Sequence, residues 1–179
     1  MHFMDLVVWA SQGCLLLVFA LSAHGKARDG RAFEEFTESV RAFAPAFAGH
    51  ARSVAALVLT GEAAAVVTLA VPATVPLGLA LSAVLLTAFT VAIAARPRTG
   101  DGVPCRCFGA ASAQPRTVLL LRNGALLAVT GGGITAAAVG GPGHAATPAA
   151  AALALCAGGV LGLLAATLDD LVGLFRPLT

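Results

Sequence analysis

Charged residues are scarce in this chain, and tyrosine is absent from it. Only 11% of the 179 residues are Asp, Glu, Lys or Arg, and 58% are apolar. A soluble globular domain has about 25% charged and about 45–50% apolar residues. The net charge is +2 and no cluster of basic residues interleaves with aromatics, which excludes a nucleic-acid-binding surface. With one Trp, the chain also lacks a clear aromatic belt. The composition is that of an integral membrane protein.

Five segments are long and apolar enough to cross a bilayer as helices, which takes about 20 residues each. The first has no Lys or Arg before it, unlike a secretory signal, and is interpreted as a retained helix. Pro72 and Pro76 separate the second and third segments. The predicted spans are residues 5–23, 53–71, 76–95, 117–139 and 148–168. The sequence thus predicts an all-α, polytopic transmembrane helix bundle that forms a single domain over residues 1–179.

Basic residues gather in alternate connections between these spans. The connections after the first and third spans and the C-terminal tail hold Lys or Arg, whereas the N-terminus and the other two turns hold neither. Such loops favour the cytoplasmic side of a membrane. We therefore expect the N-terminus outside and the C-terminus inside. The segment VPCRCFG, residues 103–109, then lies at the cytoplasmic end of the bundle.

The first connection contains an amphipathic helix, predicted over about residues 31–44. Phe33, Phe36 and Val40 recur at spacings of three and four, and charged residues occupy the opposite face. Pro45 ends the pattern. This helix is expected to lie flat on the membrane surface or to fold back over the mouth of the bundle.

Cys105 and Cys107 are the strongest candidates for chemistry. The cation of Arg106, between them, favours the thiolate, which is the reactive form of cysteine. A Cys-x-Cys disulfide closes a small, strained ring and is easily reduced, so the pair suits disulfide exchange better than a structural role. It supplies only half of a zinc site, and no second Cys-x-x-Cys accompanies it. A structural role, metal ligation and lipid attachment remain alternatives at this point.

The other two cysteines lie inside predicted helices. Cys14 and Cys156 fall at similar depths from the outer surface, so they form a candidate relay or bridge if the first and last helices touch. The alternative is that each is a small apolar filler. Gly158 and Gly162 form a G-x-x-x-G face on the last helix, which permits close helix contact within the bundle.

Ionisable residues at membrane depth are functional candidates, because burying a charge there is costly. Glu62 and Arg122 are the two within spans, and the helical rise places them close enough in depth to pair, as a clasp or in a polar pocket. Asn123 adds a hydrogen-bonding group to that pocket. His24 and Lys26 end the first helix, where basic residues complement the helix dipole and bind head groups.

The chain resembles the methylamine-utilisation family MauE, within the broader MauE/DoxX group of redox-associated membrane proteins. The likeness covers about residues 10–140. It is carried by His24-Gly25-Lys26, the Phe-rich helix, Gly61-Glu62, the CRCFG at 105–109, and Leu121-Arg122-Asn123. Two features depart from the family pattern: Arg106 stands where the family typically has glycine, and a fifth span follows the four-helix core.

The resemblance implies a multi-pass protein of the bacterial inner membrane that works with a thioredoxin-like partner. It would support disulfide formation in an exported client, which is a methylamine dehydrogenase subunit in the family's named case. No metal and no obligatory cofactor are implied. The alternatives are a non-catalytic assembly factor and a DoxX-type oxidoreductase subunit that binds a quinone. An exported client conflicts with the cytoplasmic placement of the cysteine pair. Either the pair takes reducing equivalents from the cytoplasm and passes them outward through Cys14 and Cys156, or its loop dips towards the bilayer centre.

Overall fold

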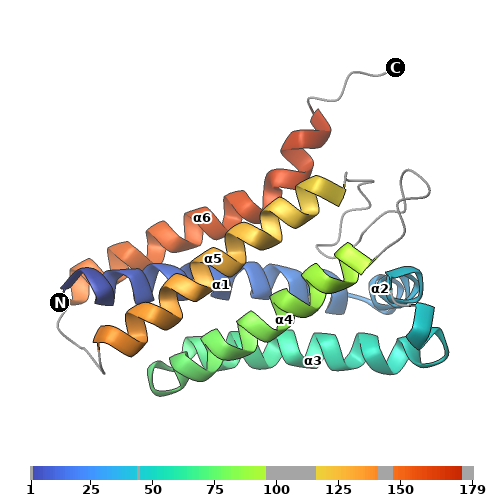
Figure 1. Cartoon of the computed structure of the whole chain (residues 1–179), viewed down its shortest axis with the longest axis horizontal. Coiled ribbons are helices and arrows are strands. Elements are labelled where there is room, and N and C mark those ends of the chain that lie inside the picture. Colours follow the sequence, from blue (N-terminus) through green and yellow to red (C-terminus); the bar gives the residue numbers. More distant parts are fainter. Residues whose placement is uncertain (1, 44, 96–115, 141–146, 175–179) are drawn as a thin grey trace.

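The computed structural model describes residues 2–43, 45–95, 116–140 and 147–174. Every regular element in these ranges is a helix, which confirms the predicted all-α fold (Figure 1). The elements in chain order are α1 His2–Ala27, α2 Gly30–Phe43, the 3₁₀ turn η1 Pro45–His50, α3 Ala51–Ala70, the 3₁₀ turn η2 Pro72–Thr74, α4 Val75–Ala95, α5 Arg116–Gly140 and α6 Pro148–Leu174.

Five of these helices, α1, α3, α4, α5 and α6, are long and apolar enough to cross a membrane. The structure therefore has the predicted number of span candidates among its described residues. Two helices run further than the predicted spans. α1 begins at His2 and continues to Ala27, and α6 continues to Leu174. Large apolar side chains such as Leu57, Leu121 and Leu153 are exposed on the outside, where lipid would meet them.

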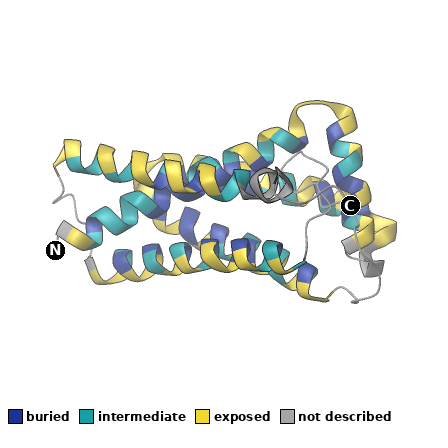
Figure 2. Ribbon diagram, turned by 90° about the horizontal axis from the view of Figure 1, so that it is seen from above, coloured by how far each residue is buried: buried dark blue, intermediate teal, exposed yellow. Residues whose placement is uncertain are grey.

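Four helices form the core of the bundle, and α6 lies outside it. α1 packs on α3 and α5, and α4 packs on the same two helices, which closes a four-helix ring. α6 packs along α1, and α2 crosses the end of the bundle opposite the N-terminus (Figure 1). Buried positions face the inside of the ring and exposed positions face outwards (Figure 2). This arrangement is the predicted four-helix core with a fifth span.

The turn between α3 and α4 shows how proline sets the element bounds. Val71 adopts an extended conformation (φ −98°, ψ 116°) directly before Pro72, because a following proline disfavours the helical conformation. Thr74 then donates its hydroxyl hydrogen to the carbonyl oxygen of Thr68 at 2.8 Å. The turn is consequently tight, and α3 and α4 pack as an antiparallel pair.

Polar side chains of α1 join α3 and α5 in the half of the bundle away from α2. Gln12 donates from Nε2 to the carbonyl oxygen of Leu69 at 2.6 Å, near the end of α3, where carbonyls lack helical partners. Ser11 donates to the carbonyl oxygen of Val129 on α5 at 3.1 Å. Toward α2, the next layer is apolar and includes the buried Leu15. That layer separates these polar groups from the pocket described below.

Glycine permits α6 to approach α1 at backbone distance. A Cβ added to Gly158 would lie 1.9 Å from the carbonyl oxygen of Ala10, and one added to Gly162 would lie 2.5 Å from that of Cys14. Gly13 on α1 meets the carbonyl of Leu155 in the same way. The predicted G-x-x-x-G face therefore makes a helix contact within the chain.

Candidate functional site

A buried ion pair joins α1 to α3 at the end of the bundle that α2 covers. Lys26 Nζ lies 2.5 Å from Glu62 Oε1, and the two side chains are 1% and 0% exposed. Helical side chains lean toward the N-terminus of their own helix. Because α1 and α3 are antiparallel, Lys26 leans into the bundle from the end of α1. Glu62, about 16 Å along α3, leans back toward it.

Ser22 completes the hydrogen bonding around this pair. Its hydroxyl lies 3.0 Å from Glu62 Oε1 and 2.7 Å from Lys26 Nζ, so the hydroxyl donates to the carboxylate and accepts from the ammonium. Ser22 and Lys26 share a face of α1 because they are four residues apart. Two aromatic rings cover the ammonium, with centroids 4.7 Å (Phe36) and 5.6 Å (Phe89) away.

A small cavity adjoins the pair, between α1, α3, α4 and α5. It is lined by Val18, Phe19, Ser22, Glu62, Leu86, Phe89, Ile93, Arg122, Asn123 and Leu126. About 20 Å³ of it is open to the centre of a water-sized sphere, and one water molecule needs roughly 10–15 Å³ by that measure. In this conformation the cavity has the size of a water site. Its polar groups converge from three helices within mostly apolar walls.

Helix α2 covers the ion pair with a face that matches the prediction only in part, since Phe33 and Val40 are half-buried and Thr37 and Ser39 are buried instead. Phe36 is buried beneath it, whereas Glu34 and Glu38 point away from the bundle. Asp29 Oδ1 accepts from the backbone N–H of Ala32 at 2.7 Å and so caps the start of α2. The helix therefore covers the mouth of the bundle, and its placement against the membrane surface stays a prediction.

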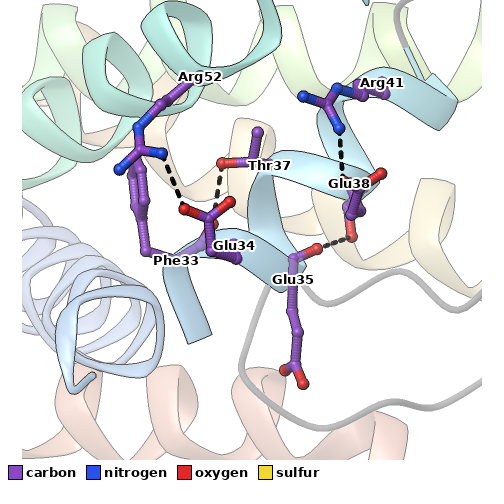
Figure 3. A network of polar contacts seen from close by, with 8 residues as sticks. Phe33, Glu34, Glu35, Thr37, Glu38, Arg41 and Arg52 are labelled. Atoms are coloured by element: carbon purple, nitrogen blue, oxygen red, sulfur yellow. Dashed lines mark hydrogen bonds and ion pairs between the residues drawn. The ribbon is translucent and has the colours of Figure 1, made fainter. Parts of the chain in front are cut away.

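An exposed ion pair also links α2 to α3. Arg52, in the first turn of α3, lies 2.9 Å from Glu34 Oε1 and stands beside the ring of Phe33 (Figure 3). Both charged side chains are more than half exposed, so the pair contributes little to stability. The buried contacts of Phe36 are therefore the stronger attachment of α2.

The structure brings four of the five predicted pocket residues together. Glu62, Arg122 and Asn123 line the cavity, and Lys26 contacts Glu62. His24 is exposed on another face of α1. The prediction paired Glu62 with Arg122, but the ion pair of Glu62 in the structure is with Lys26. The expectation that Lys26 reaches out to lipid head groups is wrong, because its side chain is buried.

Sequence reasoning missed Ser22, and it did not place Phe36 or Phe89 beside the cation. A signal for Ser22 was available: serine four residues before a lysine lies on the same helix face. No comparable signal exists for Phe89, since its contact depends on how α4 packs against α1.

The structure describes two of the four cysteines. Cys14 and Cys156 are both free thiols; Cys14 is buried in the core and Cys156 is exposed. Although α1 and α6 touch, these two side chains therefore differ in surroundings, and the relay between them stays a prediction. Cys105, Arg106 and Cys107 lie outside the described residues.

A comparison with protein-family models identifies the relatives of this bundle. The model described as "Methylamine utilisation protein MauE" matches residues 4–140. That match covers most of the chain. The chain belongs to the MauE family. No curated protein and no solved structure matches it. The MauE match includes every helix that lines the pocket, and α6 lies beyond it. Family membership and the five apolar helices together make this a multi-pass membrane protein.

Proposed function

We propose that this MauE-family protein exchanges disulfides with a thioredoxin-like partner through Cys105 and Cys107. It would thereby support the maturation of an exported, disulfide-containing client in methylamine utilisation, the process that the family description names. The observation that carries the proposal is the family match, which spans both the CRCFG segment and the pocket. The proposal requires no bound cofactor.

The end of the bundle that holds the pocket also holds the attachment points of the cysteine segment. α4 ends at Ala95 and α5 begins at Arg116, so residues 96–115 leave and rejoin the bundle there. Ile93 and Arg122, close to those attachment points, line the pocket. This connectivity supports a working relation between the pocket and the cysteine pair.

Arg106 favours thiolate chemistry at the cysteine pair. It stands between Cys105 and Cys107 in the sequence, and a nearby cation raises the fraction of a thiol that is present as thiolate.

The exchange reaction balances without a further reagent. A thiolate of the pair attacks one sulfur of the partner's disulfide, a mixed disulfide forms, and the partner's second sulfur leaves as a thiolate that takes up a proton. The other cysteine of the pair then attacks the mixed disulfide and releases the reduced partner. Two electrons pass from the pair to the partner, and the reverse sequence oxidises the partner.

We further propose that the protein lies in the bacterial inner membrane with the pocket end facing the cytoplasm. Several basic residues gather where α1, α2 and α3 meet: Arg28, Arg31, Arg41 and Arg52 are all at that end. Connections rich in Arg favour the cytoplasmic side. The N-terminus and the start of α6 are at the other end of the bundle (Figure 1).

Differential alkylation in cells tests the redox state and the location of the pair. In a variant carrying C14S and C156S, we expect Cys105 and Cys107 to be found both as thiols and as a disulfide, in proportions that follow the redox state of the partner. An impermeant maleimide should leave them unlabelled until lysis. A pair that is always reduced contradicts the exchange function, and labelling of intact cells contradicts the cytoplasmic placement.

A second candidate function is a non-catalytic assembly factor. The observation that favours it is the exposed charged face of α2, which includes Glu34, Glu38 and Arg41. Such a face is available to a partner that docks at the bundle mouth. The two candidates diverge in one variant: C105S/C107S abolishes client maturation if the pair is catalytic. If client maturation is unchanged, the assembly role replaces the exchange role.

A further inference from the structure

The carboxylate of Glu62 has one oxygen engaged and one that the described residues leave open. Oε1 accepts hydrogen bonds from Lys26 and Ser22. Oε2 is buried and has no hydrogen-bond partner among the described residues. An ionised carboxylate offers about four acceptor positions. A buried acceptor of this kind is normally satisfied by protein or by an ordered water.

The cavity beside Glu62 has the size and the polar groups of a water site. Its 20 Å³ exceeds the roughly 10–15 Å³ that a single water occupies by the same measure. Arg122 and Asn123 line the same cavity, and both side chains carry N–H donors. A water can donate to Oε2 and accept from these groups, which an ion of either sign cannot do. The remaining walls are apolar and include Phe19 and Leu126.

We propose that this cavity binds a water molecule to Glu62 Oε2, and that Glu62 exchanges a proton through that water. The water bridges α3 to α5, while Lys26 and Ser22 hold the other carboxylate oxygen in place. Glu62 is thus a proton-accepting group with a fixed orientation.

Both charged and apolar groups face Glu62. α1 contributes the Lys26 ammonium and the Ser22 hydroxyl, and α5 contributes the Arg122 guanidinium. α4 contributes Leu86, Phe89 and Ile93, all apolar. The apolar surroundings disfavour the charged carboxylate and the two cations favour it, so the two effects oppose one another at Glu62. On the side away from α2, buried apolar residues such as Leu15 separate the cavity from the other half of the bundle.

The site rests on the described geometry alone, and its use in disulfide exchange rests on the proposed function. In each exchange step a thiol gives up one proton as it becomes a thiolate, and the thiolate that leaves the broken disulfide takes one proton up. Glu62 and its water would hold that proton between the two events, so the site ends as it began.

Infrared difference spectroscopy on the purified full chain in lipid tests the site. Acidification should produce a carboxylic-acid C=O band that shifts in D₂O, and H₂¹⁸O should shift an O–H band of a bound water. Both bands should vanish in E62Q and persist in E34Q, the matched change at an exposed glutamate of α2. If neither band depends on Glu62, the proposal is overturned.

A second variant keeps the test decisive should E62Q fold poorly. L126F retains every charged group but places a larger side chain in the cavity wall, so it should delay D₂O exchange at the Glu62 carboxyl and remove the water band. Unchanged exchange in L126F overturns the water route. Failure of the cysteine pair to exchange disulfides, with the Glu62 bands intact, would refute the proposed function and leave this site standing.

Discussion

Replacing Lys26 with methionine removes the ammonium of the buried ion pair and keeps an unbranched side chain of similar length. Glu62, which is 0% exposed, then retains only Ser22 of its two hydrogen-bond donors. Removing one partner of a buried ion pair costs about 3–5 kcal/mol of unfolding free energy. Arg122 lines the same cavity and offsets part of that loss. We therefore expect K26M to lower the unfolding free energy by about 3 kcal/mol, at the low end of that range.

A double-mutant cycle separates the ion pair from the loss of packing. The double variant K26M/E62Q leaves no unpaired charge at these positions. Its loss of unfolding free energy should therefore be about 2 kcal/mol smaller than the sum of the losses in the two single variants. The assay is equilibrium unfolding of the purified protein in lipid or mild detergent, followed by helical circular dichroism. Additivity to within about 0.5 kcal/mol would refute the reasoning.

The matched control uses the exposed ion pair between Arg52 and Glu34. Both side chains are more than half exposed, at 73% and 55%. The cycle of R52M and E34Q should give a coupling free energy of at most about 1 kcal/mol, the usual limit for surface pairs. A coupling as large as that of the buried pair would show that burial does not set the difference.

Two further predictions concern packing. G158A should lower the unfolding free energy by about 1–3 kcal/mol, because its Cβ would meet the Ala10 carbonyl. The control G159A, whose Cβ would face open space, should change the unfolding free energy by less than about 0.5 kcal/mol. Equal effects of the two substitutions would contradict the α1–α6 contact. F36A should uncover Lys26, the only lysine of the chain, so an amine-reactive reagent should modify that side chain faster than in the wild type. Unchanged labelling, read by mass spectrometry, would show that α2 does not cover the pair.

The helices of this bundle were predictable because hydropathy and proline set their bounds. Spans of apolar residues must be helical in lipid, where each backbone polar group needs an internal partner. Pro72 and Pro76 then fixed the turn between α3 and α4. The period of the Phe residues gave the existence of α2 and the burial of Phe36, but not the burial of Thr37 and Ser39, which depends on how α2 packs on α1 and α3.

The partner of Glu62 was not predictable by counting depth along the helices. The helical rise placed Glu62 and Arg122 within reach of each other, and both do line one cavity. The same count of helical rise placed Lys26 at the membrane surface, because it took no account of the direction in which the Lys26 side chain points into the bundle. A long lysine side chain at the end of α1 therefore reaches a carboxylate that lies well inside α3.

The rotational position of a residue about its helix was equally hidden from the sequence. Cys14 and Cys156 have similar depths, yet Cys14 is buried and Cys156 is exposed. Which face of α6 meets α1 is decided by Gly158 and Gly162, whose lack of side chains permits backbone contact. Cys156 lies off that face, so depth alone gave an incomplete account of the two thiols.

Trapping of a mixed disulfide tests the central claim most directly. The single variants C105S and C107S each keep one cysteine of the pair, so a mixed disulfide that forms in cells cannot be resolved by the other. A covalent, reductant-sensitive complex with a thioredoxin-like protein should therefore accumulate. C14S and C156S serve as matched controls and should trap nothing. The account predicts such a complex from at least one variant of the pair. Absence of a complex from both single variants, together with normal client maturation in C105S/C107S, would contradict it.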